Sequence, residues 1–171
     1  LASNSPRRRE LLAGLDIDYR VTALPEVDES YPDTLSGEEI PLYISQEKAA
    51  AYRRFMKDNT LLITADTIVW LDGKVYGKPR DIADAKAMLQ ALSGKTHTVI
   101  TGVTLTSLQK QISFAVSTEV TFAALGDDEI DYYVETYRPL DKAGAYGVQE
   151  WIGYIGVTGL KGSYYNVMGL P

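Results

Sequence analysis

The sequence contains no cysteine and only one histidine, His97. Without cysteine the chain can form no disulfide, no thiolate nucleophile and no cysteine-based zinc site. A single histidine is too few for a histidine-based zinc site, and no Ser-His-Asp triad can be built without it. A lone histidine in a β segment is more often packed and hydrogen-bonded than catalytic, so we expect His97 to be structural.

Long apolar runs are also absent, since no stretch approaches the roughly 18 residues that a membrane helix needs. Neither a Walker A loop nor a G-x-G-x-x-G motif is present. The lack of cysteine fits a reducing compartment, so we expect a cytoplasmic protein that acts away from membranes. Because the sequence begins with Leu1, inside an expected strand, we expect that a preceding segment was trimmed.

The charge balance is acidic, with 23 Asp and Glu against 17 Lys and Arg, for a formal net charge of −6. This charge argues against broad affinity for nucleic acid, which needs a basic face. An anionic ligand would need a local basic cluster, and the densest one is the run from Arg7 to Arg9. The length of 171 residues suits one domain, 1–171, or two small lobes around a shared sheet.

Strand and helix patterns alternate along the chain, which predicts an α/β fold. The expected strands are 1–3, 18–24, 60–73, 96–107 and 112–125, the last two joined as a hairpin. One expected helix begins after Ser5, and three others cover 38–58, 81–94 and 126–139. Loops are expected at 25–37 and 75–79. The strand at 60–73 either ends near Asp66 or continues to an Asp72-Gly73 turn. The tail from Asp141 has no clear helical period.

The segment "LASNSPRRRELLAGL" combines a helix start with misplaced charge. Ser5 is a good N-cap and Pro6 a good first helical residue. Arg7, Arg8 and Arg9 then follow in the first turn, where the helix dipole disfavours cations. A bound phosphate would reverse that cost, because backbone N–H groups and guanidinium groups would share one anion. A solvated cationic face is the alternative interpretation, and the sequence gives the two about equal weight.

Carboxylates and lysines elsewhere could complete such a site. Asp66 follows an apolar run and could bind Mg²⁺ or orient water if it lies at the carboxyl end of a strand, or it could simply form a turn. The loop pair Asp28 and Glu29 could supply further oxygen ligands. Lys48 and Lys78 are single lysines, of which Lys78 stands in a loop shaped by its Gly and Pro neighbours.

Taken together, these segments resemble the Maf family of nucleoside triphosphate pyrophosphatases. The motifs that carry the resemblance occur in the family's order over nearly the whole chain: "SNSPRR", "EKA", "ADT", "GKP", "LSGKTHTVITGV", "DKAGAYGVQ" and "GSYYNVMGLP". The resemblance implies an elongated mixed β-sheet flanked by helices, with two lobes around a cleft, similar to the inosine triphosphate pyrophosphatases. It also implies Mg²⁺- or Mn²⁺-dependent hydrolysis of a nucleoside triphosphate to the monophosphate and pyrophosphate.

The resemblance further implies roles for individual residues. The catalytic and phosphate-binding set would be Ser5, Arg8, Glu29, Lys48, Asp66 and Lys78. Asp66 would be the proton acceptor, and Asp66 with Glu29 would hold the metal. The residues alone leave open whether Asp66 is a base or a metal ligand.

Three positions separate the substrate branches of the family. The branch that acts on dTTP and UTP has Arg, Thr and Gln where this chain has Arg7, Thr67 and Gln149. The branch that acts on 7-methyl-GTP has an aromatic residue, Gln and Glu there. The resemblance therefore implies hydrolysis of dTTP and UTP, and by extension of modified pyrimidine triphosphates, in house-cleaning of nucleotide pools. The alternatives are the 7-methyl-GTP specificity and a nucleotide-binding regulator of septum formation acting through a partner. A homodimer is implied at the family level only.

Overall fold

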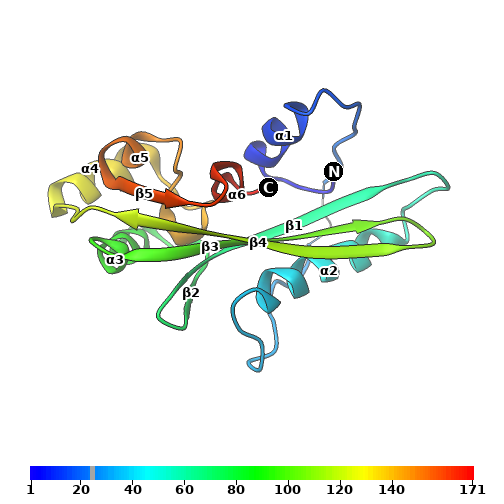
Figure 1. The fold of residues 1–171 in the computed structure, drawn as a ribbon, viewed down its shortest axis with the longest axis horizontal. Coiled ribbons are helices and arrows are strands. Elements are labelled where there is room, and N and C mark those ends of the chain that lie inside the picture. Colours follow the sequence, from blue (N-terminus) through cyan, green and yellow to red (C-terminus); the bar gives the residue numbers. More distant parts are fainter. Residues whose placement is uncertain (24–25) are drawn as a thin grey trace. The chain divides into compact units, whose positions relative to one another are not determined.

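A computed structural model describes residues 1–23 and 26–171 of the chain. The fold is α/β, with helices flanking a five-stranded sheet of strand order β2-β1-β3-β4-β5 (Figure 1). The elements, in chain order, are α1 (Pro6–Ala13), α2 (Glu39–Arg53), β1 (Leu62–Leu71), β2 (Lys74–Tyr76), α3 (Ile82–Leu92), β3 (Thr96–Thr106), β4 (Gln111–Phe122), α4 (Asp127–Tyr137), the 3₁₀ turn η1 (Ala143–Ala145), α5 (Trp151–Gly156), β5 (Val157–Lys161) and α6 (Tyr164–Met168).

Antiparallel pairing defines both edges of the sheet. β2 pairs with β1, with Leu71 opposite Lys74, and β5 pairs with β4, with Val120 opposite Leu160. β3 and β4 are hydrogen-bonded neighbours joined by the four residues 107–110, which confirms the predicted hairpin. Because strands of both directions meet at each edge, functional side chains in such a sheet need not gather at the carboxyl ends of strands.

The chain forms two compact units, in agreement with the predicted two lobes. The first unit comprises Leu1–Thr67, Ile100–Val116 and Gly169–Pro171, and the second comprises Ile68–Val99 and Ser117–Met168. The motif residues are therefore divided between the two units: Ser5, Arg8, Glu29, Lys48 and Asp66 lie in the first, and Lys78 and Gln149 lie in the second.

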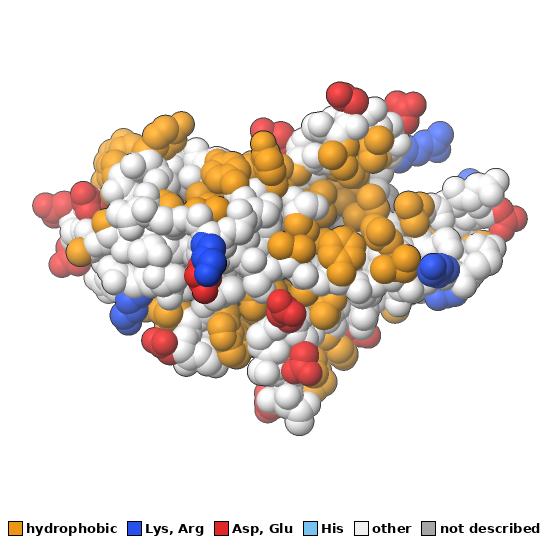
Figure 2. Space-filling model, in the orientation of Figure 1, with side chains coloured by type: hydrophobic (Ala, Val, Ile, Leu, Met, Phe, Trp, Pro, Cys, Tyr) orange, Lys and Arg blue, Asp and Glu red, His pale blue; other side chains and the backbone are white. Residues whose placement is uncertain are grey.

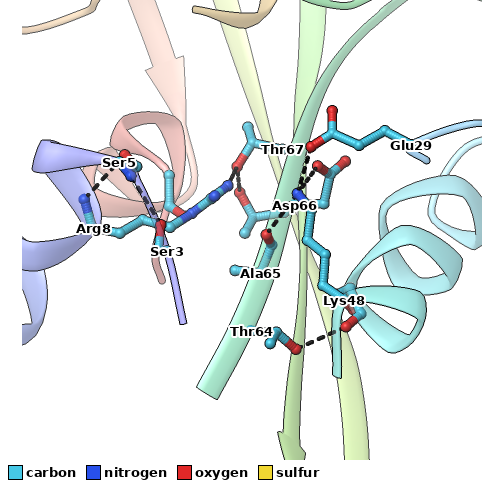
Figure 3. Close-up of polar contacts among 12 residues, drawn as sticks. Ser3, Ser5, Arg8, Glu29, Lys48, Thr64, Ala65, Asp66 and Thr67 are labelled. Atoms are coloured by element: carbon cyan, nitrogen blue, oxygen red, sulfur yellow. Dashed lines mark hydrogen bonds and ion pairs between the residues drawn. The ribbon is translucent and has the colours of Figure 1, made fainter. Parts of the chain in front are cut away.

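In the first unit, α1 and α2 lie on opposite sides of β1 (Figures 1 and 3). Ser5 is the N-cap of α1, as predicted, since its side chain accepts from the backbone N–H of Arg8. α2 packs directly on the backbone of β3, because a Cβ at Gly102 would lie only 2.4 Å from the carbonyl carbon and oxygen of Pro41. This contact lets the helix that carries Lys48 approach the strands closely.

In the second unit, α3 packs against α4 and η1. Asp81 caps α3 by accepting from Asp84 N at 2.7 Å, as the sequence predicts. His97 is buried among Phe122 and Tyr146, and its Nε2 lies 2.7 Å from the hydroxyl oxygen of Tyr146. The prediction that His97 is packed and hydrogen-bonded is confirmed.

Several large hydrophobic side chains are exposed at the surface. On the face shown in Figure 2, hydrophobic side chains gather near the β3–β4 hairpin, where Ile112 and Phe114 are exposed. Within residues 1–23 and 26–171, we find no helix with the length and hydrophobicity of a membrane span.

Several sequence-based boundaries were wrong. Among the described residues, the expected strands at 1–3 and 18–24 form only one parallel bridge, between Ala2 and Thr22; Leu24 lies outside the described residues. Of the two alternatives for the strand at 60–73, the longer one is confirmed: β1 reaches the Asp72-Gly73 turn, so Asp66 stands in mid-strand. The expected loop 75–79 begins inside β2, and the aperiodic tail contains η1, α5, β5 and α6.

Candidate active site

A buried lysine joins two carboxylates in the first unit. Nζ of Lys48, on α2, lies 2.8 Å from Oδ1 of Asp66 and 3.1 Å from Oε1 of Glu29 (Figure 3). The same ammonium lies 3.4 Å from the carbonyl oxygen of Ala65. Lys48 is only 4% exposed and Asp66 8%, whereas Glu29 reaches the cluster from an exposed loop. The structure thus brings together three of the predicted residues.

Hydroxyl groups fix α2 against the sheet one turn before Lys48. Ser45 Oγ lies 2.7 Å from Thr104 Oγ1 on β3, and Thr64 Oγ1 on β1 donates to the Ser45 carbonyl oxygen at 2.7 Å. All three side chains are fully buried. Buried hydroxyls that are fully paired restrict the position of an element. This network was not predicted from the sequence, where its local signal is the frequency of threonine in β3, at 96, 98, 101, 104 and 106.

The Asp28–Glu29 pair is separated by the structure. The Asp28 carboxylate accepts from the backbone N–H of Ser30 at 2.9 Å, and this hydrogen bond lowers the pKa of Asp28. Glu29 instead turns to Lys48. Of the two carboxylates that the sequence offered, only Glu29 joins the cluster.

Arg8 is held against the other side of β1. Its Nη2 donates to Thr67 Oγ1 at 3.0 Å and its Nε donates to the Gly169 carbonyl oxygen at 2.8 Å. Thr67 Oγ1 also lies 2.8 Å from Thr101 Oγ1. Burial lowers the pKa of the Arg8 guanidinium, while the negative charges of Asp66 and Glu29 act in the opposite direction. An arginine stays charged under such opposing effects.

The predicted residues of the first unit therefore form two clusters on the two sides of β1. Asp66 and Thr67 are consecutive in the strand, so their side chains point to opposite faces. Figure 3 shows Lys48 and Glu29 beside Asp66, and Arg8 beside Thr67. Ser5 belongs to the Arg8 side through its cap of α1, and Arg7 stands half-buried in the first turn of that helix.

Lys78 and Gln149 belong to the second unit. Lys78 is exposed between Gly77 and the buried Pro79. The loop with Lys78 is linked to the Gln149 segment, because Gly144 N donates to the Gly77 carbonyl oxygen at 3.1 Å. Oε1 of Gln149 is buried and has no hydrogen-bond partner among the described residues. A buried amide oxygen without a donor is costly, so it is suited to accept a hydrogen bond from a ligand.

The donor set around Lys48 fits a hard divalent cation. In the described part of the chain, no group of three or more His, Cys, Asp or Glu side chains could hold a metal ion. Mg²⁺, however, uses one or two carboxylates and completes its shell with water and phosphate oxygens. Asp66 and Glu29 are two carboxylates that both contact Nζ of Lys48, so they supply the number of carboxylates that Mg²⁺ uses.

Comparison with known proteins identifies the family. The sequence model of the Maf-like protein family matches residues 1–171. The chain belongs to the Maf-like family. A relative from Phocaeicola vulgatus, named dTTP/UTP pyrophosphatase, is 67% identical over 171 residues, covering 100% of this chain and 89% of the relative. Relatives of the same name from Bacteroides fragilis and Flavobacterium psychrophilum are 64% and 50% identical, again over the whole of this chain and over 89% and 87% of their own lengths.

Membership in the Maf-like family agrees with the motif order seen in the sequence. The motifs around Ser5, Lys48 and Asp66 supply the clusters on either side of β1. Those around Lys78 and Gln149 lie in the second unit. Each of the two units therefore contains residues of the family motifs.

Proposed function

We propose that this chain hydrolyses dTTP and UTP to the nucleoside monophosphate and pyrophosphate, with a divalent cation as cofactor. The observation that carries the proposal is the cluster of the buried Lys48 and Asp66 with Glu29, in a chain whose relatives are named dTTP/UTP pyrophosphatase. Buried charges of this kind are costly and are typical of sites where a reaction needs them. Such an activity would remove unwanted pyrimidine triphosphates from the nucleotide pool.

Arg8, Lys48 and Lys78 bind the triphosphate in this proposal. Phosphoanhydride cleavage requires that the negative charge of the phosphate oxygens be met by cations. The hydrogen bonds of Arg8 to Thr67 and Gly169 use two of its five N–H groups, which is compatible with phosphate binding by the others. Arg7 and the first N–H groups of α1, capped by Ser5, add to the attraction for an anion.

Asp66 orients the attacking water and accepts its proton. Lys48 lies against Oδ1 of Asp66, so the other carboxylate oxygen, Oδ2, is our assignment for the proton acceptor. Asp66 and Glu29 would hold the Mg²⁺ or Mn²⁺, whose chemistry there is neutralisation of phosphate oxygens and acidification of water. The leaving group is pyrophosphate, which departs after attack at the α-phosphate.

Gln149 recognises the base. Uracil and thymine both present an N–H donor between two carbonyl oxygens. Oε1 of Gln149 is a buried acceptor without a donor among the described residues, and its amide N–H₂ can donate to a carbonyl. This pairing favours uracil and thymine over bases that present an acceptor at the same position.

The setting of the reaction follows from composition and family. The net charge of −6 disfavours nucleic acid as a partner, and the lack of cysteine is compatible with the reducing cytoplasm. We propose action on free nucleotides in the cytoplasm, by a homodimer as the family resemblance implies.

Hydrolysis of dTTP in ¹⁸O-water with Mg²⁺, without added inorganic pyrophosphatase, tests the proposal. The expected products are labelled dTMP and unlabelled pyrophosphate, because water attacks the α-phosphate. Orthophosphate and dTDP as first products would contradict the proposed function. Nucleotide binding without turnover would favour a regulator instead.

A further inference from the structure

The ammonium group of Lys48 lies inside a set of oxygen atoms. Asp66 Oδ1, Glu29 Oε1 and the Ala65 carbonyl oxygen lie 2.8, 3.1 and 3.4 Å from Nζ. An ammonium has three N–H donors, and here three oxygen acceptors surround it. These oxygens, two from carboxylates and one from a backbone carbonyl, are of the types that Mg²⁺ and Ca²⁺ take as ligands.

Charge makes the lysine and a divalent cation competitors. Asp66 is almost fully buried, and a buried carboxylate needs a positive partner. Lys48 provides that partner in the metal-free state, at 2.8 Å from Oδ1 of Asp66. A divalent cation bound to the same oxygens would lie close to the ammonium and repel it.

We propose that Lys48 is the resident counter-ion of Asp66 and Glu29, and that a divalent cation displaces its ammonium when it binds there. The inference rests on the proposed function, which assigns the cation to these two carboxylates. The flexible four-carbon stem of lysine allows the ammonium to move while α2 stays in place. The displaced Lys48 then has no carboxylate partner and binds the triphosphate, so that metal binding and substrate binding support each other.

A second lysine in the chain offers a matched control. Lys86 Nζ lies 2.8 Å from Asp131 Oδ1 and 2.9 Å from Glu135 Oε1, so it also bridges two carboxylates. Those carboxylate side chains are 53% and 64% exposed, whereas of the two beside Lys48, Glu29 is 45% exposed and Asp66 only 11%. Lys86→Met changes the net charge by the same amount as Lys48→Met but leaves a solvated carboxylate pair.

The test is titration of the protein with Mn²⁺ in the absence of nucleotide, with free Mn²⁺ measured by electron paramagnetic resonance. Lys48→Met is expected to bind Mn²⁺ at least about tenfold more tightly than the wild type, because it lacks the competing charge. Lys86→Met and the charge-conserving Lys48→Arg are expected to gain no affinity. Unchanged or weaker binding by Lys48→Met, or an equal gain in Lys86→Met, would overturn the proposal.

A measurement on the wild type keeps the proposal testable if Lys48→Met fails to fold. Lysine acetylation is followed residue by residue by mass spectrometry, with and without saturating Mg²⁺. Labelling of Lys48 is expected to rise with Mg²⁺ while that of Lys86 stays constant, and no rise at Lys48 would refute displacement. Activity distinguishes the two proposals: a wild type that hydrolyses dTTP but shows neither effect refutes only the displacement of Lys48. A wild type that hydrolyses no triphosphate refutes the proposed function.

Discussion

The guanidinium of Arg8 donates to the hydroxyl of Thr67, with 3.0 Å between Nη2 and Oγ1. This bond ties α1 to β1 across 59 residues of sequence. The same hydroxyl also pairs with Thr101. Thr67 was predicted from the family resemblance to affect the choice of base, but its hydroxyl is already engaged by two protein groups.

Thr67→Val is expected to lower kcat/KM for all triphosphates by a similar factor. The substitution keeps the shape of the side chain and removes the acceptor for Arg8, so phosphate binding suffers and base recognition does not. A lost hydrogen bond to a charged group is worth about 1.5–3 kcal/mol, or roughly 10–150-fold. Steady-state kinetics with dTTP, UTP, CTP and GTP measure the effect, and Thr106→Val on β3 is a control for loss of a buried hydroxyl. A loss confined to dTTP and UTP would instead support a role for Thr67 in base choice.

Asp66→Asn is expected to reduce turnover of dTTP by about 10²–10⁴-fold while the protein remains folded. The amide is nearly isosteric with the carboxylate, but it cannot accept a proton and leaves the ammonium of Lys48 with only Glu29 as its carboxylate partner. Kinetics and far-UV circular dichroism measure turnover and fold. Asp131→Asn removes an exposed partner of Lys86 and should leave turnover unchanged. A folded Asp66→Asn variant with wild-type turnover would exclude Asp66 as the catalytic carboxylate.

Gln149→Glu is expected to lower kcat/KM for dTTP and UTP by a larger factor than for purine triphosphates. The change keeps an acceptor but adds charge and removes the amide donor, so the match to the pyrimidine edge is lost. Competition assays with mixed triphosphates measure the ratio directly. Gln109→Glu, in the exposed hairpin loop, adds the same charge and should not alter the ratio. Equal losses for every substrate would mean that Gln149 has a structural role only.

His97 is expected to make stability depend on pH between 6.5 and 4. Burial lowers the pKa of His97 from 6.5 to about 4, so the unfolded chain binds the proton more readily than the folded one. The stability that neutral His97 contributes is therefore complete above pH 6.5 and falls as the pH drops towards 4. Linkage gives a loss of about 2 kcal/mol between pH 7 and pH 5. Urea unfolding of the wild type and of His97→Gln at both pH values measures it, and the same loss in His97→Gln would rule out His97 as its source.

Local chemistry made part of the fold predictable. Ser5 and Asp81 were recognised as N-caps because a cap is decided by a few neighbouring residues. The hairpin of β3 and β4 followed from two alternating segments separated by a short polar loop. Elements that depend on distant partners were less predictable. The segment 18–24 has the alternation of a strand, but its described part, residues 18–23, forms only the bridge at Thr22.

Short elements without a period also escaped prediction. α5 contains two glycines and only six residues, and its place depends on tertiary contact: a Cβ at Gly156 would lie 3.0 Å from Cδ2 of Leu125. The same limit applies to the candidate site. The sequence suggested Lys48, Asp66 and, through the family resemblance, Glu29, but only the fold brings Nζ of Lys48 to both Asp66 and Glu29.

Asp66 and Thr67 are adjacent in β1 yet serve opposite faces of the strand, one beside Lys48 and the other beside Arg8. An insertion or deletion of one residue within β1 before Asp66 would exchange the two faces. The carboxylate would then point towards the guanidinium and the hydroxyl towards the lysine. Insertions and deletions in active variants of this protein should therefore be confined to loops such as 107–110. β1 should accept substitutions but no change in length.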